Sequence, residues 1–174
     1  RAPDLKNTEQ PGNHDGRTAG KPYAMMFCVQ MNHQKEFDCL WRWVVTHMYL
    51  TEGENAGYFA WSCHTDGSKN SDGPAPDGEE FFAMSLFFAA NRWGSGEGVL
   101  DYASWARRIL HACVHKGEEA GSGFPMWNPE NHLIKFIPNC EFTDPSYHLQ
   151  QINELFDMWS DDFDHPFLHA AAAA

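Results

Sequence analysis

At 174 residues, with 43% hydrophobic and 14% aromatic residues, the chain is long enough for one substantial core and too apolar for a disordered segment. Its formal net charge of −12 argues against a nucleic-acid partner, because phosphate contacts need clustered Lys and Arg. No apolar run approaches the roughly 20 residues of a membrane-spanning helix, so we expect no membrane partner.

The five cysteines are odd in number and lack CxxC spacing: Cys28, Cys39, Cys63, Cys113 and Cys140. Three of them fall within helical patterns, which favours buried thiols in a reducing compartment over a set of disulfides. No signal peptide opens the sequence, so we expect a cytoplasmic protein. The first residue is not Met, and we expect the true start to lie upstream.

The first expected helix pair spans about 20–50. Residues 1–18 have no hydrophobic period and many turn formers, which indicates a loop or an extended lead-in. From about 20 to 31 the sequence is apolar on most faces, which predicts a buried helix. Residues 34–50 carry one apolar stripe, which predicts an amphipathic helix packed beside it.

The second expected pair spans about 78–116. Residues 58–93 form an aromatic patch, then a loop rich in Gly, Pro, Asp and Asn, then a helix that is apolar nearly all round and therefore buried. Asp77 at the start of this helix, with Glu80 three residues later, predicts an Asp capping box. Residues 101–116 again show one apolar stripe, which predicts an amphipathic helix.

The third expected pair spans about 145–174. It follows a long loop, 118–143, which contains a strand-like run at 133–137. Asp144 and Pro145 predict the N-cap and first position of a helix.

Helix pairs thus recur about every sixty residues, and the first two pairs open with the more buried helix. An inner ring of buried helices backed by amphipathic ones is an all-α fold, the α/α toroid. Repeated pairs need neighbours on both sides to bury their faces, and three pairs do not close a ring. We therefore expect residues 1–174 to be part of a toroid catalytic domain, namely its N-terminal half.

Four segments resemble the glycoside hydrolases of family 8: RTAGKPYAMMFCVQM from Arg17, AGYFAWSC from Ala56, APDGEEFFAMSLFFAANRW from Ala75 and DPSYHL from Asp144. Within that family, the chain is most similar to the reducing-end xylose-releasing exo-oligoxylanases, over about 12–159. The resemblance implies a closed ring of six helix pairs. It also implies an inverting hydrolase that releases xylose from the reducing end of short xylo-oligosaccharides, with no cofactor.

Inverting hydrolysis needs a carboxylic acid that protonates the leaving oxygen and a carboxylate that activates water. The family's acid is the Glu of an Arg-Thr-Glu-Gly motif, and this chain has Ala19 at that position. The family's base lies beyond the position that matches Ala174. The resemblance therefore implies an inactive form. A non-catalytic carbohydrate-binding protein and a family 8 endo-glucanase or endo-xylanase stay open as alternatives, and the oligomeric state is also open.

The same resemblance implies roles for four further residues. Asp77 matches an aspartate that grips the sugar at the cleavage subsite, and Tyr147 matches a tyrosine that holds the attacking water. Trp61 matches a sugar-stacking platform, and Trp127, in the next long loop, is expected to line the cleft. From the residues alone, plainer alternatives are a helix cap for Asp77, a core position for Trp61 and simple packing for Tyr147.

Two weaker patterns concern metals. His111 and His115 are spaced for one helix face but lack a third ligand. The loop from Asp66 to Asp77 imitates a calcium loop, but Ser71 replaces its turn glycine. We therefore expect no metal site.

Overall fold

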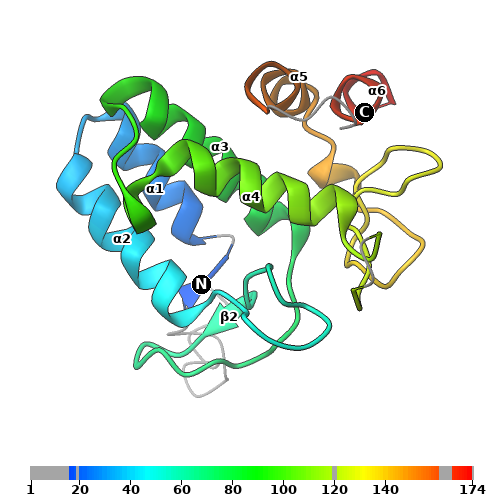
Figure 1. The fold of residues 1–174 in the computed structure, drawn as a ribbon, viewed down its shortest axis with the longest axis horizontal. Coiled ribbons are helices and arrows are strands. Elements are labelled where there is room, and N and C mark those ends of the chain that lie inside the picture. Colours follow the sequence, from blue (N-terminus) through cyan, green and yellow to red (C-terminus); the bar gives the residue numbers. More distant parts are fainter. Residues whose placement is uncertain (1–15, 19, 119–120, 161–165, 174) are drawn as a thin grey trace, which may run out of the picture.

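In the computed structural model, which describes residues 16–18, 20–118, 121–160 and 166–173, helices form three consecutive pairs (Figure 1). The pairs are α1 (Gly20–Gln30) with α2 (Gln34–His47), α3 (Pro76–Trp93) with α4 (Tyr102–His115), and α5 (Gln150–Trp159) with α6 (Phe167–Ala173). The members of each pair pack against each other, and α1, α3 and α5 also contact in series. The fold is all-α as predicted, and the series α1, α3, α5 with one partner behind each helix is that of a partial α/α toroid.

Helix α3 is the centre of this arrangement. An aromatic cluster joins it to its neighbours: the ring of Trp41 in α2 lies 5.9 Å from those of Phe59 and Phe82 and 5.4 Å from that of Trp105. Helix α2, the loop before α3, α3 itself and α4 therefore meet at one point of the core. Aromatic pairs at such distances add to the stability that their burial provides. The start of α3 is consequently held from several sides.

The start of α3 differs from the prediction. Its N-cap is Ala75, which has no side-chain capping bond, and Pro76 is the first helical residue. Asp77 lies within the first turn, and both carboxyl oxygens of Glu80 are buried without a hydrogen bond to any described residue. The predicted Asp77–Glu80 capping box is therefore wrong. Proline at the first position has the backbone angle that a helix needs, so the helix begins at Pro76, two residues before the predicted start at 78.

A short antiparallel ribbon, absent from the predicted elements, joins a strand before α1 to a strand between α2 and α3. Strand β1 (Gly16–Arg17) pairs with β2 (Ser62–Cys63), and the backbone N–H of Thr18 then donates to the carbonyl oxygen of Trp61 at 2.9 Å. The same segment packs against the first turn of α3, because a Cβ at Gly78 would lie 2.3 Å from the Cβ of Thr18. Two-residue strands have no detectable period, so sequence patterns do not predict them.

The third pair also differs at its start. Asp144 caps a 3-10 helix, Pro145–Tyr147, by accepting from the backbone N–H of Ser146 at 2.9 Å. Helix α5 begins later, at Gln150, since His148 and Leu149 have ψ angles of 84° and 87°, outside the helical region. The cap is thus where the sequence places it, but the α-helix predicted from Pro145 is not.

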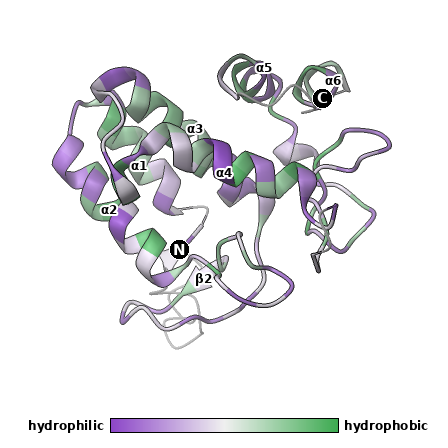
Figure 2. Ribbon diagram, viewed as in Figure 1, coloured by the Kyte–Doolittle hydropathy of each residue, from purple (hydrophilic) through white to green (hydrophobic). Residues whose placement is uncertain are grey.

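Helix α1 has apolar side chains on a face that no described element covers. Tyr23, Phe27 and Met31 are 48%, 69% and 68% exposed, so this helix is less buried than predicted, because no described element covers that face. Met158 of α5 and Leu168 of α6 are similarly exposed, at 71% and 59%. Figure 2 shows α3 and α6 as predominantly hydrophobic. None of the helices in the described ranges combines the length and apolarity needed to cross a membrane.

These exposed residues lead to a first prediction. Residues 1–174 expressed alone are expected to self-associate and to enhance the fluorescence of an apolar dye, because soluble monomers rarely expose such contiguous apolar surface. Light scattering after size exclusion and dye titration measure both properties, and the double variant Phe27→Ser, Met31→Ser should bind less dye. A monomeric, cooperatively melting, dye-silent product would contradict the prediction.

Candidate active site

A pocket of about 380 Å³ opens at the N-terminal end of α3. It is formed by β1 and the residue after it, the loop before α3, the run at 136–137 and the 3-10 helix. Its lining residues are Arg17, Thr18, Trp61, Pro74, Ala75, Asp77, Phe136, Ile137 and Tyr147. The structure thus brings three of the predicted site residues, Trp61, Asp77 and Tyr147, into one pocket.

Trp61 is held by its backbone while its ring lines the pocket. Its N–H donates to the carbonyl oxygen of Gly73, and its carbonyl oxygen accepts from Thr18, both at 2.9 Å. The side chain is 37% exposed, and the guanidinium carbon of Arg17 lies 5.3 Å from the ring centroid. A partly exposed indole on a fixed backbone offers a flat apolar face to a ligand. The alternative of a core tryptophan does not describe this position.

Asp77 is half-buried beside Trp61, and its pKa is raised above the ordinary value for an aspartate. Partial removal from water is the main cause, and the negative charge of Asp144 adds to it. Hydrogen bonding to the backbone N–H of Gly78 acts in the opposite direction. A carboxyl in the first turn of a helix also benefits from the helix dipole. The group is therefore an anchored hydrogen-bond acceptor in the lining of the pocket.

Tyr147 lines the same pocket from the 3-10 helix. Its ring is parallel to that of Phe136, at 6.2 Å and 3°, and Phe136 stacks in turn on Phe142 at 5.3 Å. Partial burial, followed by the charge of Asp77, raises the pKa of Tyr147 to about 12. The phenol therefore keeps its proton at neutral pH and remains a hydrogen-bond donor.

The other two predicted residues are not placed in this pocket. Ala19 lies outside the described residues, although its neighbour Thr18 lines the pocket. Trp127 is 2% exposed, and its ring meets that of Phe167 at 5.5 Å in an edge-to-face contact. It packs in the core between the long loop and α6 and is not among the residues that line the pocket.

Phe136, Ile137 and Thr18 line the pocket but were not among the candidate residues. For Phe136 a signal exists, since it belongs to the strand-like run at 133–137 that interrupts a loop. Thr18 reaches the pocket through pairing between β1 and β2, which residue patterns do not show.

No metal site accompanies the pocket in the part of the chain that the structure describes: no group of three or more His, Cys, Asp or Glu is arranged to hold an ion. The rings of His111 and His115 lie 4.9 Å apart, and Nδ1 of His115 is 2.9 Å from a Glu118 carboxyl oxygen. Asp66 accepts from both the backbone N–H and the hydroxyl of Ser68, as in a local turn.

Comparison with known proteins places these features in a family. The model of the glycosyl hydrolases family 8 matches residues 8–161. A reducing end xylose-releasing exo-oligoxylanase of Bifidobacterium adolescentis is 56% identical over 163 residues, which cover 94% of this chain and 43% of that protein. The protein of the same name from Halalkalibacterium halodurans is 55% identical over 98% of this chain and 44% of its own length.

Solved structures of family members have the same fold as this chain. That of Rex8A from Paenibacillus barcinonensis, complexed with xylose, has a TM-score of 0.89 at 55% identity, covering 93% of this chain and 43% of the other. The chain therefore spans less than half the length of the relatives that it matches. With a family model matched over most of its residues, the chain belongs to glycosyl hydrolase family 8.

Proposed function

We propose that the full protein carrying this chain binds xylo-oligosaccharides in the pocket at the start of α3. We further propose that it descends from an inverting hydrolase that releases xylose from the reducing end. The observation that carries this proposal is the convergence of Trp61, Asp77 and Tyr147 on one pocket. High identity to relatives named for this activity supports the choice of substrate.

The pocket supplies what a sugar ring needs. A pyranose has a flat C–H face and a rim of hydroxyls, so a site for it combines an aromatic platform with fixed polar groups. Trp61 is the proposed platform, Asp77 accepts from hydroxyls, and Tyr147 donates to a water or a hydroxyl of the ligand. Such polar groups favour the matching ligand, because any other ligand leaves them unpaired.

A second candidate function is carbohydrate binding without turnover. It is favoured by Ala19, which has no proton to give at the position of the family's acid. Both candidates share the pocket and the ligand, and they differ in the rate of hydrolysis. Release of internal fragments from longer chains would instead indicate an endo-acting enzyme.

Binding of xylotriose to the full-length Ala19 protein tests the shared part of the proposal. Trp61→Ala and Asp77→Ala are each expected to weaken binding by about 1–3 kcal/mol, as when a buried polar or aromatic partner is lost. Tyr147→Phe should cost less, because a hydroxyl that holds water acts mainly in catalysis. Calorimetry measures the affinities.

The exposed Glu97, which lies outside the pocket, provides a control for the loss of a carboxylate: Glu97→Ala should bind as the parent does. Unchanged affinity in both Trp61→Ala and Asp77→Ala would place the sugar elsewhere on the protein.

A further inference from the structure

The first turn of α3 carries a second carboxyl, which does not reach the pocket. Asp77 is half-buried and lines the pocket, whereas Glu79 is fully buried and is not among the lining residues. Burying a carboxyl costs free energy unless its oxygens are hydrogen-bonded. One oxygen of Glu79 accepts the backbone N–H of Phe59 at 2.9 Å. The Glu79 side chain therefore connects α3 to the segment that leads into Trp61.

That segment is already paired along its other edge. Residues 48–50 and 58–60 are joined by an antiparallel bridge between Tyr49 and Phe59, and backbone N–H groups on either side of the bridge donate across it at 2.9 and 2.8 Å. In an antiparallel pair, alternate residues direct their N–H groups toward the partner, and the residues between them direct theirs away. Phe59 is of the second kind, so its N–H faces the opposite edge and reaches Glu79.

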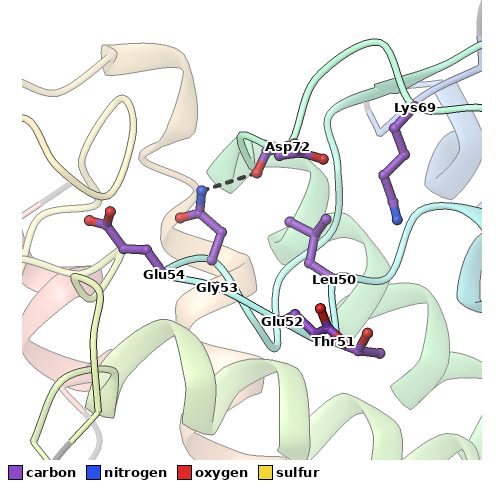
Figure 3. A pocket seen from close by; sticks show the side chains of 8 residues that line it. Leu50, Thr51, Glu52, Gly53, Glu54, Lys69 and Asp72 are labelled. Carbon is purple, nitrogen blue, oxygen red and sulfur yellow. Dashed lines mark hydrogen bonds between the residues drawn. The ribbon is translucent and has the colours of Figure 1, made fainter.

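The same opposite edge also bonds to the loop before α3. Its next N–H is that of Trp61, which donates to the carbonyl oxygen of Gly73 in this loop at 2.9 Å. The preceding residue of the loop is Asp72, whose carbonyl oxygen accepts from the side-chain amide of Asn55 at 3.0 Å (Figure 3). This bond holds the loop that receives Trp61. The backbone around Trp61 is thus fixed both by this loop and by Glu79.

The hydrogen bond of Glu79 adds something that apolar packing does not provide. The ring of Phe59 also packs on α3, with its centroid 5.0 Å from that of Phe82. Such contact is largely non-directional, so by itself it permits the segment to slide along the helix. A hydrogen bond has a preferred length and angle, so the Glu79 bond fixes the register of the segment against α3. Because Asp77 lies in the same helical turn as Glu79, the bond also fixes where Trp61 lies relative to Asp77.

We propose that Glu79 is a positioning residue for sugar binding: its carboxyl holds the backbone of Phe59 and thereby sets the indole of Trp61 against the ligand. The proposal rests on the proposed function. Glu79 needs no charge for this role, because the oxygen of an amide side chain accepts the same N–H. An apolar side chain of similar size leaves the buried N–H of Phe59 without that partner, which favours a shift of the segment.

The test titrates xylotriose calorimetrically into the full-length Ala19 protein and its variants at position 79. Glu79→Gln keeps an acceptor and should bind as the parent does. Glu79→Met has a similar length but only a weak acceptor, and it should bind roughly tenfold more weakly, since the platform is displaced. Glu97→Met, at an exposed glutamate outside the pocket, is the matched control and should bind as the parent does.

A double-mutant cycle with Trp61→Ala separates positioning from a general loss of stability. If Glu79 acts through the indole, Glu79→Met should cost no further affinity in the Trp61→Ala background. A fold that is merely destabilised loses the same factor of affinity in both backgrounds. Near-ultraviolet circular dichroism checks that each variant is folded.

The remaining outcomes overturn the proposal. Equal losses in both backgrounds, or a Glu79→Met protein that binds as the parent does, show that Glu79 does not position Trp61. If neither Glu79→Met nor Glu79→Leu folds, Glu79 is a determinant of the fold and not a positioning residue. In each of these cases a loss of affinity in Trp61→Ala still supports the proposed function. If the parent itself does not bind xylotriose, both proposals fall.

Discussion

Replacing Ala19 by Glu in the full-length protein is expected to raise the rate of xylo-oligosaccharide hydrolysis by roughly 10²–10⁴-fold, the usual contribution of a general acid. Residue 19 directly follows Thr18, which lines the pocket and donates its N–H to the carbonyl of Trp61. A carboxyl introduced there is therefore expected to protonate the leaving oxygen.

The rate tests the role of residue 19, and the anomeric configuration of the product tests the inverting mechanism. Inversion gives the α configuration at the new reducing end of the shortened oligosaccharide, because water attacks opposite the leaving group. Proton NMR of fresh product distinguishes the anomers before they equilibrate. Ala19→Gln is the matched control, since it adds similar volume without an acidic proton and should stay at the rate of the parent. An Ala19→Glu protein that binds xylotriose but hydrolyses it no faster would contradict the assignment of residue 19, and initial β product would contradict inversion.

Helix positions were predictable where the pattern is local. The apolar stripe predicted for 34–50 is the buried face of α2, with Phe37, Trp41 and Val44. The continuously apolar run predicted as a buried helix is α3, and most of its residues are buried. Helix starts were less predictable: Pro76 and the non-helical angles at His148 determine where α3 and α5 begin, and these depend on single residues.

The candidate site shows the same division. Trp61, Asp77 and Tyr147 were identified through motif resemblance, and their convergence depends on contacts between distant segments that no local pattern contains. Trp127 illustrates the limit, because a loop position does not reveal whether its ring faces a cleft or the core. Phe136 is the opposite case: it was not predicted as a site residue, yet it lines the pocket and stacks on Tyr147.

The two glutamates after Asp77 lead to the other large expected effect. Glu79 and Glu80 are fully buried at the start of α3. One carboxyl oxygen of Glu79 accepts the N–H of Phe59 at 2.9 Å, and within the described part of the chain the other three oxygens of the pair have no hydrogen bond. Burial raises the pKa of Glu79 to about 8, and it raises the pKa of Glu80 well above the ordinary value of 4.5. Both carboxyls therefore hold their protons to higher pH in the folded chain than in the unfolded chain.

The sign of the pH dependence follows. Between about pH 4.5 and 8 the unfolded chain has released the Glu79 proton that the folded protein still holds, so the free energy of unfolding falls as pH rises. Glu79 alone contributes on the order of 1.4 kcal/mol per pH unit in that window. The raised pKa values of Glu80 and Asp77 act in the same direction. His148, whose pKa is lowered by burial, acts in the opposite direction near pH 6.5.

The full-length protein is thus expected to lose a few kcal/mol of stability between pH 5 and pH 8, measured by denaturant titration at fixed temperature. Glu79→Gln keeps an acceptor for the N–H of Phe59 but cannot ionise, so it should flatten this dependence, as should Glu80→Gln. Glu97→Gln, at an exposed glutamate, should leave the slope unchanged. If neither Glu79→Gln nor Glu80→Gln alters the slope, the prediction is wrong. Both carboxyls are then ionised and paired in the folded full-length protein, and other groups hold the protons between pH 5 and 8.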